Sequence, residues 1–112
     1  MTTIFSKIIT KEIPAKIIFE DDLCLAFHDV NPQAPVHILL IPKITEIDRL
    51  DNAKTSHQQL LGHLLLKVSE IARGLDLSDY RVIINNGEGA GQSVFHLHLH
   101  LLGGRELAWP PG

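Results

Sequence analysis

The chain has 112 residues, of which 45% are hydrophobic and 21% charged, and its formal net charge is −3 at pH 7. This length suits one domain over residues 1–112 with its own core, and the slightly negative charge argues against a surface that binds a nucleic acid polymer. Cys24 is the only cysteine and cannot form an internal disulfide, and neither a signal peptide nor a membrane span is evident, so we expect a cytoplasmic protein without membrane contact.

Hydrophobic spacing and turn residues predict the elements of the first part of the chain. Apolar side chains at helical intervals before Pro14 indicate a short helix, and the acidic pair Asp21 and Asp22 separates two short apolar runs in the manner of a hairpin. A third apolar run lies between Pro35 and Pro42 and places His37 on the same face as Leu39. The predicted order is a helix, two strands, a loop and a third strand, at residues 3–12, 17–20, 23–28, 29–35 and 36–41.

In the second part the hydrophobic period changes from two to about 3.6 and back again. A long amphipathic helix over 55–75 is predicted, with a capping box of Ser56 and Gln59 at its start and Gly74 at its end. His57 and His63 within this helix are expected to be surface residues. Strands follow over 80–85 and 94–102. We therefore predict an α+β fold with one short and one long helix and a five-stranded antiparallel sheet.

The last predicted strand carries three histidines that alternate with leucines, in the order His96, Leu97, His98, Leu99, His100 and Leu101. A period of two places the three histidines on one face of the strand and the leucines on the other, in the core. At about 3.3 Å per residue, neighbouring histidines are roughly 6.6 Å apart along the strand. The spacing therefore favours an extended row over a compact cluster.

Four interpretations are open for this row: a structural coincidence, a metal site, a metal-chelating histidine tract, and covalent catalysis by a neutral imidazole. The intervening leucines argue against a tract, and the extended spacing argues against a tetrahedral zinc site, whose ligand atoms lie only a few ångströms apart. Histidine changes its charge near neutral pH, so one imidazole can attack an electrophile while its neighbours move protons. Covalent catalysis is the favoured interpretation.

Residues 94–102 resemble the histidine triad, His-x-His-x-His-x-x with apolar x, of the HIT superfamily of nucleotide hydrolases and transferases. Other segments are similar to the Hint branch of that superfamily, the purine nucleoside phosphoramidases: residues 4–9, 27–37, 91–93, 102–105 and 109–112. The resemblance covers nearly the whole chain and is weakest over about 44–56. It implies a HIT-like fold and a homodimer in which two five-stranded sheets join into one.

The resemblance also implies a mechanism without a cofactor or a metal. His98 would attack the α-phosphorus of a purine nucleoside 5′-phosphoramidate, and water would then release the nucleoside monophosphate from His98. His96 and His100 would flank the phosphate with N–H donors, and His37 would polarise the triad. The alternatives are a dinucleoside polyphosphate hydrolase, a non-catalytic nucleotide-binding regulatory protein and a zinc-binding module.

A glycine-rich turn precedes the triad and lacks the Gly-Lys-Ser/Thr ending of a P-loop, so it fits either an ordinary hairpin connection or a phosphate cradle. By resemblance it contributes phosphate-site and nucleotide-binding residues: Asn85, Gly91, Gln92 and Ser93, of which Ser93 would protonate the leaving amine. Asp29 is similar to the carboxylate that binds the ribose hydroxyls, and a loop-opening Asx turn is its alternative role. The purine would lie among four apolar side chains: Phe5, Ile8, Phe27 and Val30.

Overall fold

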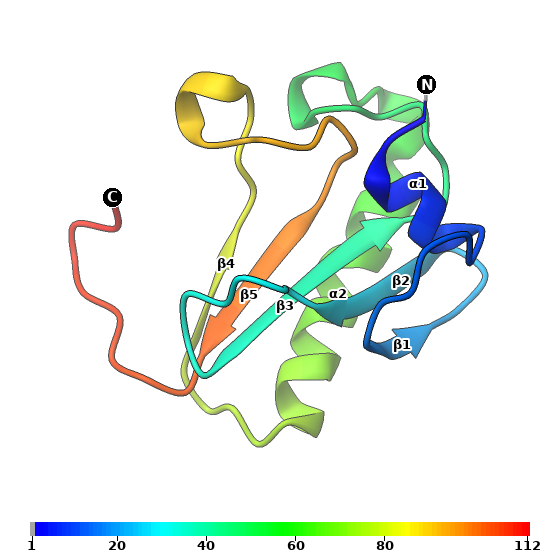
Figure 1. Cartoon of the computed structure of the whole chain (residues 1–112). Coiled ribbons are helices and arrows are strands. Elements are labelled where there is room, and N and C mark those ends of the chain that lie inside the picture. The colour runs from blue at the N-terminus through cyan, green and yellow to red at the C-terminus, as the bar shows by residue number, and fades with distance from the viewer. Residues whose placement is uncertain (1) are drawn as a thin grey trace.

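The computed structural model describes residues 2–112 and contains one five-stranded sheet in the order β1-β2-β3-β5-β4 (Figure 1). All four strand pairs are antiparallel. The strands are β1 Ile17–Glu20, β2 Cys24–His28, β3 Val36–Pro42, β4 Tyr80–Ile83 and β5 Leu99–Gly103. The helices are α1 Ile4–Ile9 and α2 Gln58–Gly74, with short 3₁₀ turns at η1 Leu50–Asn52, η2 Thr55–His57 and η3 Glu88–Ala90. The predicted α+β class and antiparallel five-stranded sheet are confirmed.

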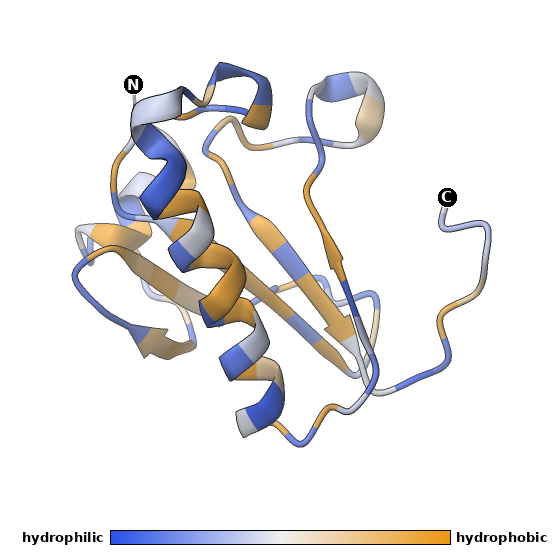
Figure 2. Cartoon of the chain, turned by 180° about the vertical axis from the view of Figure 1, so that it is seen from behind, coloured by the Kyte–Doolittle hydropathy of each residue, from blue (hydrophilic) through white to orange (hydrophobic). Residues whose placement is uncertain are grey.

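The sheet separates two apolar clusters, and α2 crosses one face of the sheet while α1 lies on the other (Figures 1 and 2). The cluster under α2 contains Cys24, Ala26, Ile38, Leu40, Leu64, Val68, Leu97, Leu99 and Leu101, among others. The cluster under α1 contains Phe5, Ile8, Leu25, Phe27, Leu39 and Ile41. Alternate residues of β2 and β3 therefore point to opposite clusters, as a period of two requires. Neither α-helix within residues 2–112 is long and apolar enough to cross a membrane.

The strand predicted over 94–102 is shorter than expected, because β5 begins only at Leu99. The last β3–β5 pair joins Leu40 to Leu99, and the chain before it leaves the ladder, with the Leu97 N–H donating to the Ile47 carbonyl at 2.9 Å. Pro42 ends β3 and has no N–H with which to continue the pairing. The leucine side of the alternation nevertheless extends to Leu97, which is buried in the cluster under α2.

The start of the long helix also differs from the prediction, since α2 begins at Gln58 after the short turn η2. The predicted capping box of Ser56 and Gln59 is wrong, because the N-cap residue of α2 is His57 and makes no side-chain cap bond to the helix. Instead, His57 Nδ1 accepts the N–H of Lys54 at 3.0 Å, and His57 Nε2 lies 3.3 Å from Glu46. His57 is consequently buried rather than on the surface.

We expect Leu99→Ala to lower the free energy of unfolding by about 2–5 kcal/mol, because it leaves a cavity between β5 and α2. Leu99 is 1% exposed and belongs to the cluster under α2. Urea denaturation followed by circular dichroism measures the change. Ile4→Ala is the control, since Ile4 is exposed on α1 and its truncation should change the stability by no more than about 0.5 kcal/mol. Equal effects of the two substitutions would contradict this packing.

Candidate active site: the histidine row

The histidine row (His96, His98 and His100) lies on the face of the sheet opposite α2, and its first two members are covered by α1. Phe5 of α1 meets the His98 ring edge-on at a centroid distance of 5.0 Å and the His96 ring at 6.1 Å. His96 is only 1% exposed and His98 only 7%. The row is thus a desolvated group of imidazoles, and the hydrogen bonds of each ring determine where its proton lies.

The tautomer of His98 follows from its position beside a carbonyl. His98 Nδ1 lies 2.7 Å from the backbone oxygen of His96, which can only accept a hydrogen bond. Nδ1 therefore carries the proton, and in the neutral ring Nε2 keeps a free lone pair. Burial lowers the pKa of His98 below its ordinary value, which favours this neutral form at pH 7. The ring is prepared to act as a nucleophile through Nε2.

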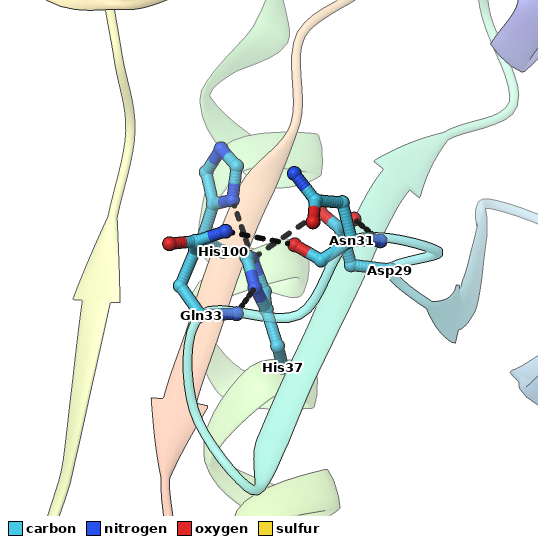
Figure 3. A network of polar contacts seen from close by, with 5 residues as sticks. All are labelled: Asp29, Asn31, Gln33, His37 and His100. Atoms are coloured by element: carbon cyan, nitrogen blue, oxygen red, sulfur yellow. Dashed lines mark hydrogen bonds and ion pairs between the residues drawn. The ribbon is translucent and has the colours of Figure 1, made fainter.

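A second chain of hydrogen bonds fixes the tautomers of His37 and His100 (Figure 3). The backbone N–H of Gln33 donates to His37 Nδ1 at 3.0 Å, so a neutral His37 carries its proton on Nε2. His37 Nε2 lies 2.9 Å from His100 Nδ1 and donates to it, which leaves the proton of His100 on Nε2. His100 Nε2 is buried without a hydrogen-bond partner among the residues that the structure describes. It is an N–H donor that none of these residues uses.

Burial keeps all these rings neutral. It is the main cause that lowers the pKa values of His37, His96 and His98, and together with the neighbouring His98 and His37 it lowers the pKa of His100 to about 4. The rings of His98 and His100 are 5.0 Å apart. The row therefore places a lone pair on His98 next to an N–H donor on His100, a pairing suited to attack on a phosphate whose oxygens need stabilisation.

His96 differs from its predicted role as an N–H donor to phosphate. Its Nε2 lies 2.8 Å from the carbonyl oxygen of Pro42, to which it donates, so the remaining ring nitrogen is an acceptor. The ring ties the segment before β5 to the end of β3, and its backbone carbonyl orients His98. The geometry makes His96 a positioning residue, because its one N–H is already used inside the protein.

Asp29 forms the Asx turn considered for it and also approaches His37. Its Oδ1 accepts the N–H of Asn31 at 2.8 Å, which is the Asx turn, while Oδ2 lies 3.4 Å from His37 Nε2 (Figure 3). Asp29 also borders an open hollow of about 700 Å³, lined by Pro14, Ala15, Lys16, His28, Asp29, Val30 and Pro32. Sequence reasoning did not find Lys16 and His28 as neighbours of this hollow, although His28 adjoins Asp29 in the sequence.

The four residues predicted around the purine do not form one pocket. Phe5, Ile8 and Phe27 pack together in the cluster under α1, where Phe5 and Phe27 meet edge-on with ring centroids 5.5 Å apart. Val30 is fully exposed in the loop after β2 and lines the hollow beside Asp29. The apolar trio is a wall behind the histidine row, and Val30 belongs to the open space next to it.

The glycine-rich turn is held in shape by Gln92, which is 2% exposed. Gln92 Oε1 accepts the N–H of Gly87 at 2.9 Å, and its Nε2 donates to the carbonyls of Asp48 at 2.7 Å and Val94 at 3.1 Å. These bonds occupy the side chain, so the predicted nucleotide contact is open only to its backbone. Gly91 adopts a φ of 97°, which favours glycine.

The other predicted residues of this turn keep polar groups near the surface. Ser93 and Gly91 are exposed, and Asn85 is half-buried. The Asn85 amide lies next to Gly91, because a Cβ on Gly91 would come within 3.7 Å of Asn85 Nδ2. The structure thus brings Asn85 and Gly91 together.

Gln33 and Arg105 are site residues that sequence reasoning missed. Gln33 acts through its backbone N–H on His37, and the Arg105 guanidinium holds the Gln33 carbonyl with Nε at 3.2 Å and Nη2 at 3.0 Å. A backbone donor has no side-chain signature, so no motif marks Gln33. Arg105 lies in the bend directly after β5, and residues 27–37 and 102–105 are both among the segments that resemble the Hint branch.

A metal ion is disfavoured at the group of ligand-type side chains that the described residues place inside this site. Asp29, His37 and His100 offer atoms that lie within 4.8 Å of one another. A metal on His37 Nε2 would require the proton to move to Nδ1, where it would face the N–H of Gln33. Two donors would then point at each other, and the bond that orients His37 would be lost. The donor set therefore fits a hydrogen-bonded relay better than a metal centre.

We expect the free energy of unfolding to fall as the pH is lowered from about 6.5 to about 4. In this range the unfolded state binds a proton at His100 that the folded state does not, since its pKa is about 4 when folded. Each histidine that is charged only when unfolded contributes a slope of about 1.4 kcal/mol per pH unit. Urea denaturation at several pH values measures it. His100→Asn should flatten the slope, whereas His28→Gln, at an exposed position, should not; the reverse result would contradict the assignment.

Comparison with known proteins identifies the family of the chain. The HIT domain family matches residues 10–107.

The chain belongs to the HIT family.

Two curated relatives of this HIT protein match over nearly its whole length. An uncharacterized HIT-like protein of Synechocystis is 63% identical over 111 residues, which cover 98% of this chain and 96% of the relative. The 14 kDa zinc-binding protein of Zea mays is 52% identical over 112 residues, covering 98% and 88% respectively.

Solved structures of HIT proteins share the fold. A HIT family hydrolase from Legionella pneumophila superposes with a TM-score of 0.95 at 44% identity and covers 99% of this chain and 100% of its own. A histidine triad nucleotide-binding protein from Candida albicans gives a TM-score of 0.83 at 32% identity, covering 97% and 83%. The HIT fold predicted from the sequence is therefore confirmed.

Proposed function

We propose that this HIT protein hydrolyses the P–N bond of purine nucleoside 5′-phosphoramidates through a nucleotidyl-histidine on His98. The observation that carries the proposal is the lone pair of His98 Nε2 in a ring next to the unpartnered N–H of His100. The hydrolase name of the Legionella protein and the nucleotide-binding name of the Candida protein support this class of reaction. The choice of the P–N bond and of the Hint branch rests on the resemblance of the sequence.

The proposed first step is attack of His98 Nε2 on the α-phosphorus, which forms an N–P bond as the bond to the amine breaks. The exposed hydroxyl of Ser93 gives a proton to the departing amine. His98 becomes positively charged, and the hydrogen bond from its Nδ1–H to the His96 carbonyl at 2.7 Å stabilises that charge. His100 Nε2–H donates to a phosphate oxygen, which stabilises the negative charge of the transition state.

In the proposed second step a water molecule attacks the same phosphorus and breaks the bond to His98. The nucleoside monophosphate leaves, one proton of the water returns to Ser93, and His98 is neutral again. His37 keeps the tautomer of His100 constant through both steps by its bond at 2.9 Å. No metal takes part in either step.

The nucleotide would span the boundary between the histidine row and the hollow beside Asp29. Asp29 Oδ2 accepts from the ribose hydroxyls, and Val30, which lines the hollow, covers the purine, while Phe5, Ile8 and Phe27 support the histidine row from behind. Asn85 and the backbone of Gly91 face the phosphate, and Gln92 acts by shaping the turn.

The proposal includes a cytoplasmic homodimer of the single HIT domain over residues 1–112. β1 and β4 form the two edges of the sheet, so each leaves backbone groups that a second copy can pair with. The resemblance to the Hint branch supports a sheet that continues across the dimer. Size-exclusion chromatography with light scattering tests this part on its own.

We expect turnover of adenosine or guanosine 5′-phosphoramidates that is unchanged after dialysis against EDTA. The name of the maize relative suggests zinc, but the relay from Gln33 to His37 and His100 leaves no nitrogen of His37 for a metal. The measurement is release of nucleoside monophosphate with and without EDTA.

Diadenosine polyphosphates, tested in the same panel, separate the alternatives. Faster cleavage of these substrates would favour the dinucleoside polyphosphate hydrolase. Tight binding of purine nucleotides without turnover of any substrate would favour a regulatory protein. Loss of turnover that stoichiometric zinc restores would overturn the metal-free mechanism.

A further inference from the structure

A second group of ligand-type side chains lies on the other face of the sheet, under α2. It consists of Asp21 in the turn between β1 and β2, Cys24 at the start of β2, and His63 in α2. One atom of each lies within 4.8 Å of the others. Cys24 belongs to the apolar cluster under α2, whereas the histidine row faces α1, so the sheet separates this group from the candidate active site. The proposed phosphoramidase reaction makes no use of it.

The carboxylate of Asp21 is oriented before any ligand arrives. Asp21 Oδ1 accepts the N–H groups of Leu23 and Cys24, both at 2.8 Å. This leaves Oδ2 to face His63 Nε2, which it meets at 2.7 Å, and the Cys24 sulfur lies within 4.8 Å of these atoms. The carboxylate pKa is lowered to about 2, so it is ionised. Such fixed orientation of a ligand by backbone donors is typical of the surroundings of metal sites.

We propose that Asp21 Oδ2, Cys24 Sγ and His63 Nε2 bind a thiophilic divalent cation of the Zn²⁺ class, with water as the fourth ligand. Carboxylate, thiolate and imidazole are the three side-chain donors that tetrahedral zinc takes, and one of each gives a centre with no net charge. Asp21 and His63 are each 27% exposed, which gives the ion a route from solvent, whereas Cys24 is fully buried behind them.

The protons balance without loss of any other bond. His63 moves its proton from Nε2 to Nδ1, which has no partner among the described residues, and the Cys24 thiol releases one proton to solvent as the cation takes its place. His63 thus has the freedom that the Gln33 N–H denies to His37. Lys67 and Lys43 are the nearby cations; Lys67 pairs with Glu70 at 3.0 Å and Lys43 with Glu20 at 2.8 Å, which moderates their repulsion of the ion.

The expected effect of the cation is mechanical and not catalytic. Its ligands come from the turn after β1, from β2 and from α2, so it would tie the helix to the edge of the sheet. A ligand that binds only the folded state raises its stability by mass action. Without the cation, burial raises the pKa of the Cys24 thiol to about 12, and the thiol is therefore unreactive at neutral pH.

Cobalt(II) is the probe that tests this site, because a thiolate bound to Co²⁺ gives an ultraviolet sulfur-to-cobalt charge-transfer band. Cys24 is the only cysteine of the chain, so this band can arise from no other residue. We expect metal-free full-length protein to develop the band with one equivalent of Co²⁺, together with the visible bands of a tetrahedral centre, and Zn²⁺ to abolish them. Zn²⁺ should also raise the melting temperature.

The variants distinguish this site from the histidine row. Cys24→Ser should abolish the charge-transfer band, and His63→Gln and Asp21→Asn should each weaken Co²⁺ binding by at least about tenfold. His98→Asn and His28→Gln are matched controls that should keep the band and the affinity. Absence of the band in the wild-type protein at saturating Co²⁺, or a band that survives both His63→Gln and Asp21→Asn unchanged, would overturn the proposal. Neither result bears on phosphoramidate turnover, which is measured separately.

Discussion

His98→Asn should reduce turnover of a purine nucleoside 5′-phosphoramidate by at least about 10⁴-fold, the scale seen when a hydrolase loses its nucleophile. Asn keeps a side-chain N–H that can reach the His96 carbonyl, so the local fold should persist, but it removes the lone pair of Nε2. Binding of the nucleoside monophosphate should stay within a few-fold, because Asp29 and the glycine-rich turn are unchanged. Rates come from product release, and binding from calorimetry.

The covalent intermediate offers a direct test of the same prediction. Rapid acid-free quenching of the wild-type reaction should trap nucleotide on the protein in a base-stable, acid-labile linkage, as a phosphorus–imidazole bond requires. The adduct should be missing from His98→Asn and present in His96→Asn. If His98→Asn still formed it, the nucleophile would be another histidine of the row.

His100→Asn should lower kcat by about 10²–10³-fold, the cost of one lost donor to a developing oxyanion. Its Nε2–H is buried and has no partner within residues 2–112, and His37 fixes the tautomer that presents it. The KM should change little, since the donor matters most in the transition state. Steady-state kinetics on the folded variant separate the two constants.

His96→Asn is the comparison for His100→Asn, and its effect should be smaller. The His96 ring donates to the Pro42 carbonyl, and the atom that orients His98 is the His96 backbone oxygen, which the substitution keeps. Equal losses of kcat in the two variants would contradict the division of the row into a phosphate donor and a positioning residue.

The sequence predicted those parts of the fold that depend on local periodicity. Alternation of histidine and leucine correctly placed Leu97, Leu99 and Leu101 in the cluster under α2, and it placed His37 on the face of Leu39. The start of β5 was not predictable in this way, because it depends on Pro42 at the end of β3. The Pro42 carbonyl bonds the ring of His96, which lies 54 positions later in the sequence. Apolar alternation continues past the point where pairing stops.

The sequence pointed to the histidines of the candidate site but not to their proton positions. The pattern and the resemblance named His37, His98 and His100, yet the tautomers depend on a Gln33 backbone N–H and a His96 backbone carbonyl. Similarly, His63 was expected to be a surface residue, whereas it is half-buried and bonded to Asp21. The sequence could not reveal this bond, because the two residues are 42 positions apart. The sequence gives the type of each side chain, whereas the tertiary fold determines which group a buried nitrogen bonds to.

The peptide N–H of Gln33 has a consequence for which nitrogen of His100 carries the proton. The loop after β2 carries that donor, and Arg105 holds the loop by its Gln33 carbonyl at 3.0 Å. If the loop swings outward, His37 is free to adopt its other tautomer, and the proton of His100 is then drawn from Nε2 to Nδ1. The movement of one peptide plane would thereby convert the Nε2 donor of His100 into an acceptor, with no change in net charge or in any side chain.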